Sequence, residues 1–66
     1  MDNEPNITIN GKPLTSAQSM LVRVAVTSFH SEMQEPDALG NDEHGRAMVK
    51  GYRERAREVL DLLLAQ

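Results

Sequence analysis

Apolar residues recur at helical spacing along residues 15–34, and they fall on two faces of the predicted helix. The first face consists of Ala17, Leu21, Val24 and Ser28. The second face consists of Val22, Val26, Phe29 and Met33. A surface helix usually has one apolar stripe, so two stripes predict two partners. We expect one to be the rest of the chain and the other a second copy, and we assign the second face to that oligomer interface.

The start of this helix has its own signal. Thr15 followed by Gln18 forms a capping box, in which each side chain accepts the other residue's backbone N–H. A strand is the competing interpretation, because Val22, Val24 and Val26 alternate. The cap, the length of the segment and the absence of glycine or proline before Pro36 favour the helix.

A second helix is predicted over residues 42–65, after a loop at 35–41 that contains Pro36 and Gly40. Asn41 is the expected N-cap, with the acidic first turn favoured by the helix macrodipole. Gly51 costs about 1 kcal/mol relative to alanine in mid-helix, which suggests a close helix crossing. The expected core stripe consists of Met48, Tyr52, Ala56, Val59 and Leu63.

The N-terminal part of the chain predicts a small β-element. Residues 1–6 are polar and are expected to form a disordered tail. Residues 7–14 contain an alternating apolar stretch followed by Asn10 and Gly11, the pair best suited to a type I′ turn. The fold class is therefore mainly α: a single domain over residues 1–66, a helical hairpin with a short N-terminal β-element, assembling as a homo-oligomeric helical bundle.

Composition supports oligomerisation. A chain of 66 residues has a marginal core, and small domains compensate with disulfides, metals or further subunits. The chain has no cysteine, which excludes disulfides and thiolate metal sites. Its longest uninterrupted apolar run, residues 62–65, is too short to span a membrane, and its N-terminus lacks a secretory signal. We expect a cytoplasmic protein without membrane partners or cofactors, and the net charge of −3 argues against nucleic-acid binding.

Two polar patterns are candidates for ligand binding. On the second helix a basic stripe consists of Arg46, Lys50, Arg53 and Arg57. It is suited to phosphates or carboxylates, but it can equally be a solvated face paired with Glu54, Glu58 and Asp61. On the first helix, Ser19, Arg23 and His30 form the polar strip. Arg23 either meets an anion at a subunit junction, or extends to solvent or pairs with a structural carboxylate such as Asp42.

Other candidate residues have simpler explanations. Asp42, Glu43 and His44 resemble a metal or acid–base cluster, yet helix capping accounts for the acids. Phe29 and Tyr52 are expected in the core, although Tyr52 beside basic residues is also suited to contacting a base or ribose. The chain has no catalytic triad spacing, phosphate loop or dinucleotide motif, so we do not expect an enzyme.

Several segments together resemble small accessory proteins of tailed phages and prophages of proteobacteria. They are Ile7–Gly11, Leu14–Gln18, Val22–Ala25 with Phe29, Leu39–Gly45 and Gly51–Arg53. The resemblance implies a compact protein without enzymatic activity that neutralises a component of the host. It adds no catalytic residues.

The leading hypothesis is a phage-type binding protein that sequesters a small anionic ligand, namely a nucleotide-derived immune signal. The expected ligand-binding residues are Arg23, His30, Asp42, Glu43, His44, Arg46, Lys50, Tyr52 and Arg53. The alternative is an inhibitor or adaptor that masks a host protein through the apolar face of the first helix. A DNA-binding regulator ranks third, because the connection between the helices is longer than a helix-turn-helix uses.

Overall fold

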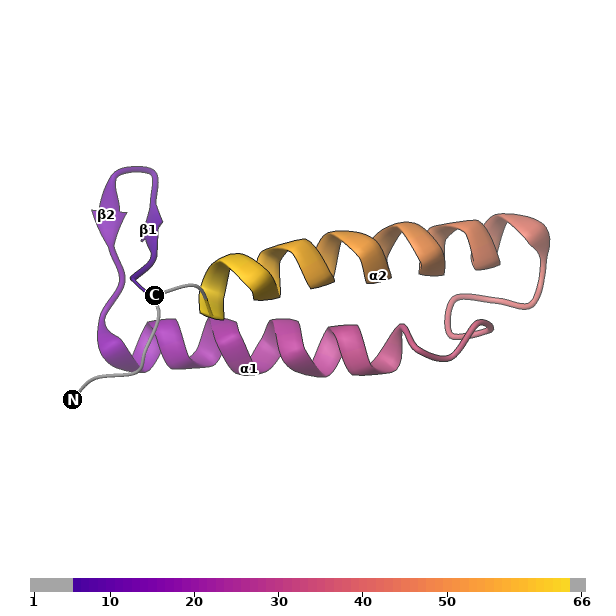
Figure 1. The fold of residues 1–66 in the computed structure, drawn as a ribbon, viewed down its shortest axis with the longest axis horizontal. Coiled ribbons are helices and arrows are strands. Elements are labelled where there is room, and N and C mark those ends of the chain that lie inside the picture. Colours follow the sequence, from indigo (N-terminus) through magenta and orange to yellow (C-terminus); the bar gives the residue numbers. More distant parts are fainter. Residues whose placement is uncertain (1–5, 65–66) are drawn as a thin grey trace.

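A computed structural model describes residues 6–64 as a helical hairpin preceded by a β-hairpin (Figure 1). The elements in chain order are β1 (Thr8–Ile9), β2 (Lys12–Pro13), α1 (Ser16–Glu32) and α2 (Glu43–Leu64). The helices lie side by side and antiparallel, joined by residues 33–42. The prediction of a mainly α chain with a short N-terminal β-element is confirmed. Residues 1–5 of the expected tail and residue 65 of the expected second helix lie outside the described residues.

The β-hairpin closes through the turn that the sequence predicts. Asn10 and Gly11 both have positive φ, at 52° and 80°, as a type I′ turn requires. Thr8 pairs with Pro13 and Ile9 with Lys12, in antiparallel register. The N–H of Leu14 donates to the carbonyl of Ile7 at 2.8 Å, which extends the ladder beyond the strands. The hairpin lies at the end of the molecule where α1 begins and α2 ends (Figure 1).

The capping box at the start of α1 is confirmed. The N–H of Gln18 donates to Thr15 Oγ1 at 3.1 Å, and the N–H of Thr15 donates to Gln18 Oε1 at 2.9 Å. These bonds satisfy two backbone donors that would otherwise depend on water.

Thr15→Ala is expected to lower the free energy of unfolding by about 1 kcal/mol, the usual cost of losing an N-cap side chain. Chemical denaturation followed by circular dichroism measures it. Ser16→Ala is the matched control, because it removes a neighbouring hydroxyl that caps nothing among the described residues. Equal destabilisation by both variants would contradict the capping role.

Asp42, rather than the predicted Asn41, caps α2. Its Oδ1 accepts the N–H of Gly45 at 2.7 Å, and its carbonyl accepts the N–H of Arg46 at 3.0 Å. The helix accordingly begins at Glu43. Both residues are good caps in isolation, so the choice depends on how the connecting loop approaches the helix.

The loop approaches so closely that only glycine fits at position 45. A Cβ on Gly45 would lie 2.7 Å from the carbonyl oxygen of Leu39 and 2.9 Å from that of Gly40. Gly45 is buried as a result. Gly51, in contrast, has nothing within 4 Å of a Cβ. The predicted close helix crossing at Gly51 is therefore wrong, and the close approach occurs at Gly45.

The core is a narrow seam in which positions repeat every seven residues. From α1 the seam includes Ser19 and Val26, and Met33, the residue that follows the helix, continues it. On α2 it consists of Val49, Ala56 and Leu63, all buried. The predicted stripe on α2 was correct for Ala56 and Leu63 but wrong for Met48, Tyr52 and Val59, which stay partly exposed. Because α2 packs against only one helix, the strip of side chains that it buries is narrower than the face of α2 that carries apolar residues.

The two apolar faces of α1 have the opposite roles from those predicted. The face assigned to the oligomer interface packs against α2, and the other face is exposed. Met33, assigned to the oligomer interface, is only 2% exposed and belongs to the chain's own core. Val22 and Val26 are half-buried on the side of α1 that meets α2, while Phe29 lies at its edge. The other face is the open one: Leu21 is 67% and Val24 52% exposed.

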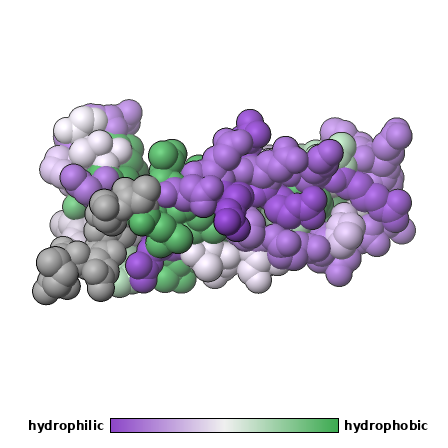
Figure 2. All heavy atoms as spheres, in the orientation of Figure 1, coloured by the Kyte–Doolittle hydropathy of each residue, from purple (hydrophilic) through white to green (hydrophobic). Residues whose placement is uncertain are grey.

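Hydropathy is distributed unevenly along the hairpin. Figure 2 shows hydrophobic residues gathered toward the end where the β-hairpin meets the two helices. Hydrophilic residues cover most of α2 and the connecting loop on the same face.

Candidate functional site

A polar groove runs along one side of the helical seam. Its volume is about 510 Å³, and its lining residues are His30, Gln34, Arg53, Glu54, Arg55, Arg57 and Glu58. His30 comes from the last turn of α1, and Gln34 follows that helix. The five residues from α2 supply three arginines and two glutamates, and Asp61, which pairs with Arg57, balances the third positive charge.

Arg53 is the cation of this groove that has no carboxylate partner. It is half-buried, and among residues 6–64 no ion pair involves it. Arg57 is paired with Asp61 at 3.2 Å and Arg55 with Glu58 at 2.8 Å. A partly desolvated guanidinium without a carboxylate retains its full capacity for two parallel bonds to an oxyanion.

His30 and Gln34 form the opposite wall of the groove. Gln34 Nε2 donates to the carbonyl of His30 at 3.0 Å and lies 3.4 Å from His30 Nε2. This arrangement holds the amide against the imidazole and keeps both at the mouth of the groove. Gln34 is absent from the sequence-based candidates, although it lies four residues after His30 within the predicted helix, a spacing that places the two side chains on one face.

The other predicted ligand residues do not join this groove. Arg23 is seven residues, or about 10 Å of helix, from His30, and its Nη2 contacts Met20 Sδ at 3.7 Å. Arg46 lies near the loop, where it pairs with Asp37 at 3.0 Å. Lys50 is exposed on α2 outside the groove.

The Asp42–His44 cluster is part of the helix start. The Asp42 carboxylate accepts the N–H of Gly45 in the first turn of α2, and Glu43 and His44 are exposed to solvent. Within residues 6–64, no group of three or more histidine, aspartate or glutamate side chains is placed to hold a metal ion. Asp42 therefore has a structural role as the cap of α2.

Tyr52 lies on the other side of the seam, in an apolar groove. This groove has a volume of about 430 Å³ and is lined by Ala25, Val26, Phe29, Tyr52, Arg55, Ala56 and Val59. The ring of Tyr52 meets that of Phe29 edge to face, with centroids 5.6 Å apart and planes at 84°. Tyr52 is thus an aromatic partner of Phe29, and Arg55 is the arginine that lines both this groove and the polar groove.

The basic stripe predicted on α2 is divided by its surroundings. Arg46 and Arg57 are paired with carboxylates, whereas Lys50 and Arg53 have no ion pair within the described part of the chain. The solvated-face interpretation therefore describes Arg57, whose partner Asp61 is four residues along the helix. Of the whole stripe, Arg53 combines an unpaired charge with a place in the groove.

Comparison with known proteins identifies no relative. No protein family, curated protein or solved structure matches this chain. In the described residues, neither helix is long and apolar enough to cross a membrane. Function is therefore inferred from the two grooves and the exposed face of α1.

Proposed function

We propose that this chain is a non-enzymatic binding protein that holds a small phosphate-bearing anion in the polar groove. The observation that supports this is the half-buried, unpaired guanidinium of Arg53 opposite His30 and Gln34. Guanidinium and imidazole groups are donors suited to phosphate, and the Gln34 amide adds a neutral donor and acceptor. The anion is a nucleotide-derived immune signal, an expectation that comes from the resemblance to phage accessory proteins.

The groove has room for such a ligand but does not enclose it. Its volume of about 510 Å³ is largely open to solvent, so a bound ligand would lie along the groove and stay partly exposed. Glu54 lines the groove and supplies an acceptor for ribose hydroxyls or base amino groups, whereas the Glu58 carboxylate is paired with Arg55. The two carboxylates also select against multiply charged anions that lack hydrogen-bond donors.

Arg53→Ala is expected to weaken binding of the anion about 10–100-fold, since a hydrogen bond to a charged group contributes about 1.5–3 kcal/mol. Calorimetric titration against cyclic dinucleotides, ADP-ribose and inorganic phosphate measures this. Arg46→Ala is the matched control, because it removes the same charge from the same helix outside the groove. If no compound in the panel binds the unaltered protein, or if both variants lose equal affinity, the proposed site is wrong.

A second candidate function rests on a different surface. The face of α1 that points away from α2 carries Leu21 and Val24, both more than half exposed, flanked by small residues. An amphipathic helix face of this kind is suited to a groove on another protein. In this case the chain masks a host protein, and Leu21→Glu is expected to abolish complex formation with that protein while leaving anion binding unchanged.

A further inference from the structure

The outer edge of α2 carries a row of exposed apolar residues. Met48, Tyr52 and Val59 are each more than a third exposed, and Leu62 is 75% exposed. Their spacing of three, four or seven residues places them along one side of the helix. Exposed apolar rows of this length are usually covered by a partner.

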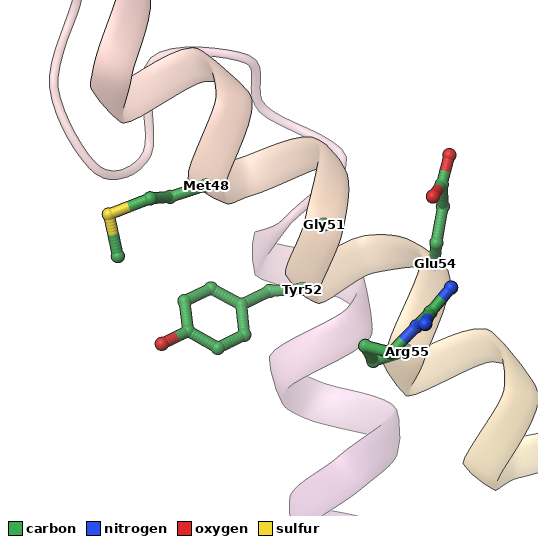
Figure 3. A pocket seen from close by; sticks show the side chains of 5 residues that line it. All are labelled: Met48, Gly51, Tyr52, Glu54 and Arg55. Carbon is green, nitrogen blue, oxygen red and sulfur yellow. The ribbon is translucent and has the colours of Figure 1, made fainter.

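A hollow interrupts this row at Gly51. It has a volume of about 440 Å³ and is lined by Met48, Gly51, Tyr52, Glu54 and Arg55. Figure 3 shows Met48 and Tyr52 extending to one side of Gly51 and Glu54 and Arg55 to the other. Beyond the adjacent residues and the helix backbone itself, no atom of residues 6–64 lies within 4 Å of a Cβ placed on Gly51. Packing within the chain therefore does not explain why a residue that costs about 1 kcal/mol in mid-helix is present here.

The outer edge of α2 is complementary to itself. Met48 and Leu62 lie seven residues before and seven residues after Arg55. Gly51 and Val59 lie four residues before and four residues after it. Two antiparallel copies of α2 related by a two-fold axis at Arg55 would place Val59 of each copy over Gly51 of the other. The same axis would bring Leu62 of each copy against Met48 of the other. A two-fold interface requires such a self-complementary patch.

The charge at this axis is partly offset within each chain. Arg55 Nη2 is paired with Glu58 Oε2 of its own chain at 2.8 Å, with both side chains exposed. Glu58 therefore reduces the repulsion between the two Arg55 side chains, and their aliphatic stems add apolar contact.

We propose that a second copy of this chain covers the outer edge of α2, forming a two-fold antiparallel dimer in which the hollow at Gly51 receives Val59 of the other copy. The small core supports a second copy as the occupant. Among residues 6–64 only four apolar side chains are buried, and chains of this size commonly gain stability by oligomerisation.

This dimer and the proposed anion site adjoin at Glu54 and Arg55, which line both the hollow and the polar groove. They rest on different residues: the anion site on His30 and Arg53, and the dimer on Gly51, Val59 and Leu62, none of which lines the polar groove. Loss of anion binding in Arg53→Ala with the dimer retained, or loss of the dimer in Leu62→Glu with anion binding retained, therefore separates the two proposals.

Sedimentation velocity tests the assembly. The unaltered protein is expected to be dimeric at about 100 μM, where a micromolar Kd gives nearly complete association. Gly51→Gln fills the hollow without a clash inside the monomer, and it is expected to weaken dimerisation at least tenfold while keeping the helical circular dichroism. Leu62→Glu is expected to do the same. Leu21→Glu is the matched control, because it places the same charge on a similarly exposed leucine of α1.

A single cysteine tests the position of the axis. The chain has no cysteine, so Arg55→Cys introduces one thiol per copy at the proposed axis, where mild oxidation is expected to link two chains. Leu21→Cys is expected to remain largely unlinked. A monomeric unaltered protein, loss of the dimer with Leu21→Glu but not with Leu62→Glu, or equal cross-linking at both cysteines would each overturn the proposal.

Discussion

Met33→Ala is expected to lower the free energy of unfolding by about 2–5 kcal/mol, the range for truncating a buried large aliphatic side chain to alanine. Met33 is 2% exposed and closes the seam at the loop end of the hairpin. The seam has few buried apolar side chains, so the neighbours have little freedom to collapse into the cavity. Since small domains have a total stability of only about 5–15 kcal/mol, most of the helical signal is expected to be lost at moderate temperature.

Thermal and urea denaturation followed by circular dichroism measure this effect. Met20→Ala is the matched control, because it makes the same chemical change within α1 at a side chain that is partly exposed, whereas Met33 directly follows that helix. We expect Met20→Ala to change stability by less than about 1 kcal/mol, helped by the better helix propensity of alanine. Equal destabilisation by the two variants would mean that Met33 is not in the core.

Gly45→Ala and Gly51→Ala are expected to change stability in opposite directions. At position 45 the added methyl group would meet two backbone oxygens at less than 3.0 Å, and neither can move without separating the loop from α2. Overpacking of this kind costs about 1–3 kcal/mol, more than the helix propensity that alanine adds. At position 51 the methyl group enters open space, and the variant is expected to gain about 1 kcal/mol.

Urea denaturation of both variants at dilute protein concentration measures the pair. Each variant is the control for the other, because both replace glycine by alanine within the same helix. Stabilisation by Gly45→Ala would show that the loop does not approach α2 as described. Destabilisation of the isolated chain by Gly51→Ala would show that Gly51 has a neighbour within its own chain.

The local parts of the fold were predictable because their signals lie within a few residues of one another. The capping box needs only Thr15 and Gln18, and the β-turn needs only Asn10 and Gly11. The two helices follow from spacing and from the glycine and proline between them. Each of these features is decided by backbone preferences and short-range hydrogen bonds.

The candidate site was predictable in part. The charge pattern of α2 pointed to Arg53, and the polar strip of α1 pointed to His30, which the structure places in the same groove. Gln34 was missed, and Arg23, Arg46 and Tyr52 lie elsewhere. The difference arises because a helical projection gives the angle of a residue around its own axis but not the level at which the antiparallel partner crosses it.

The sequence by itself determined that α1 has two apolar faces, one more than a single partner can cover. Only the tertiary structure decided that the face with Met33 packs in the core and that Leu21 stays exposed. It also decided that the connecting loop contacts α2 closely at Gly45, and that no close contact occurs at Gly51. The physical reason is that hydrophobic periodicity fixes which residues share a face, whereas the choice between two similar faces depends on the loop that sets how the helices meet.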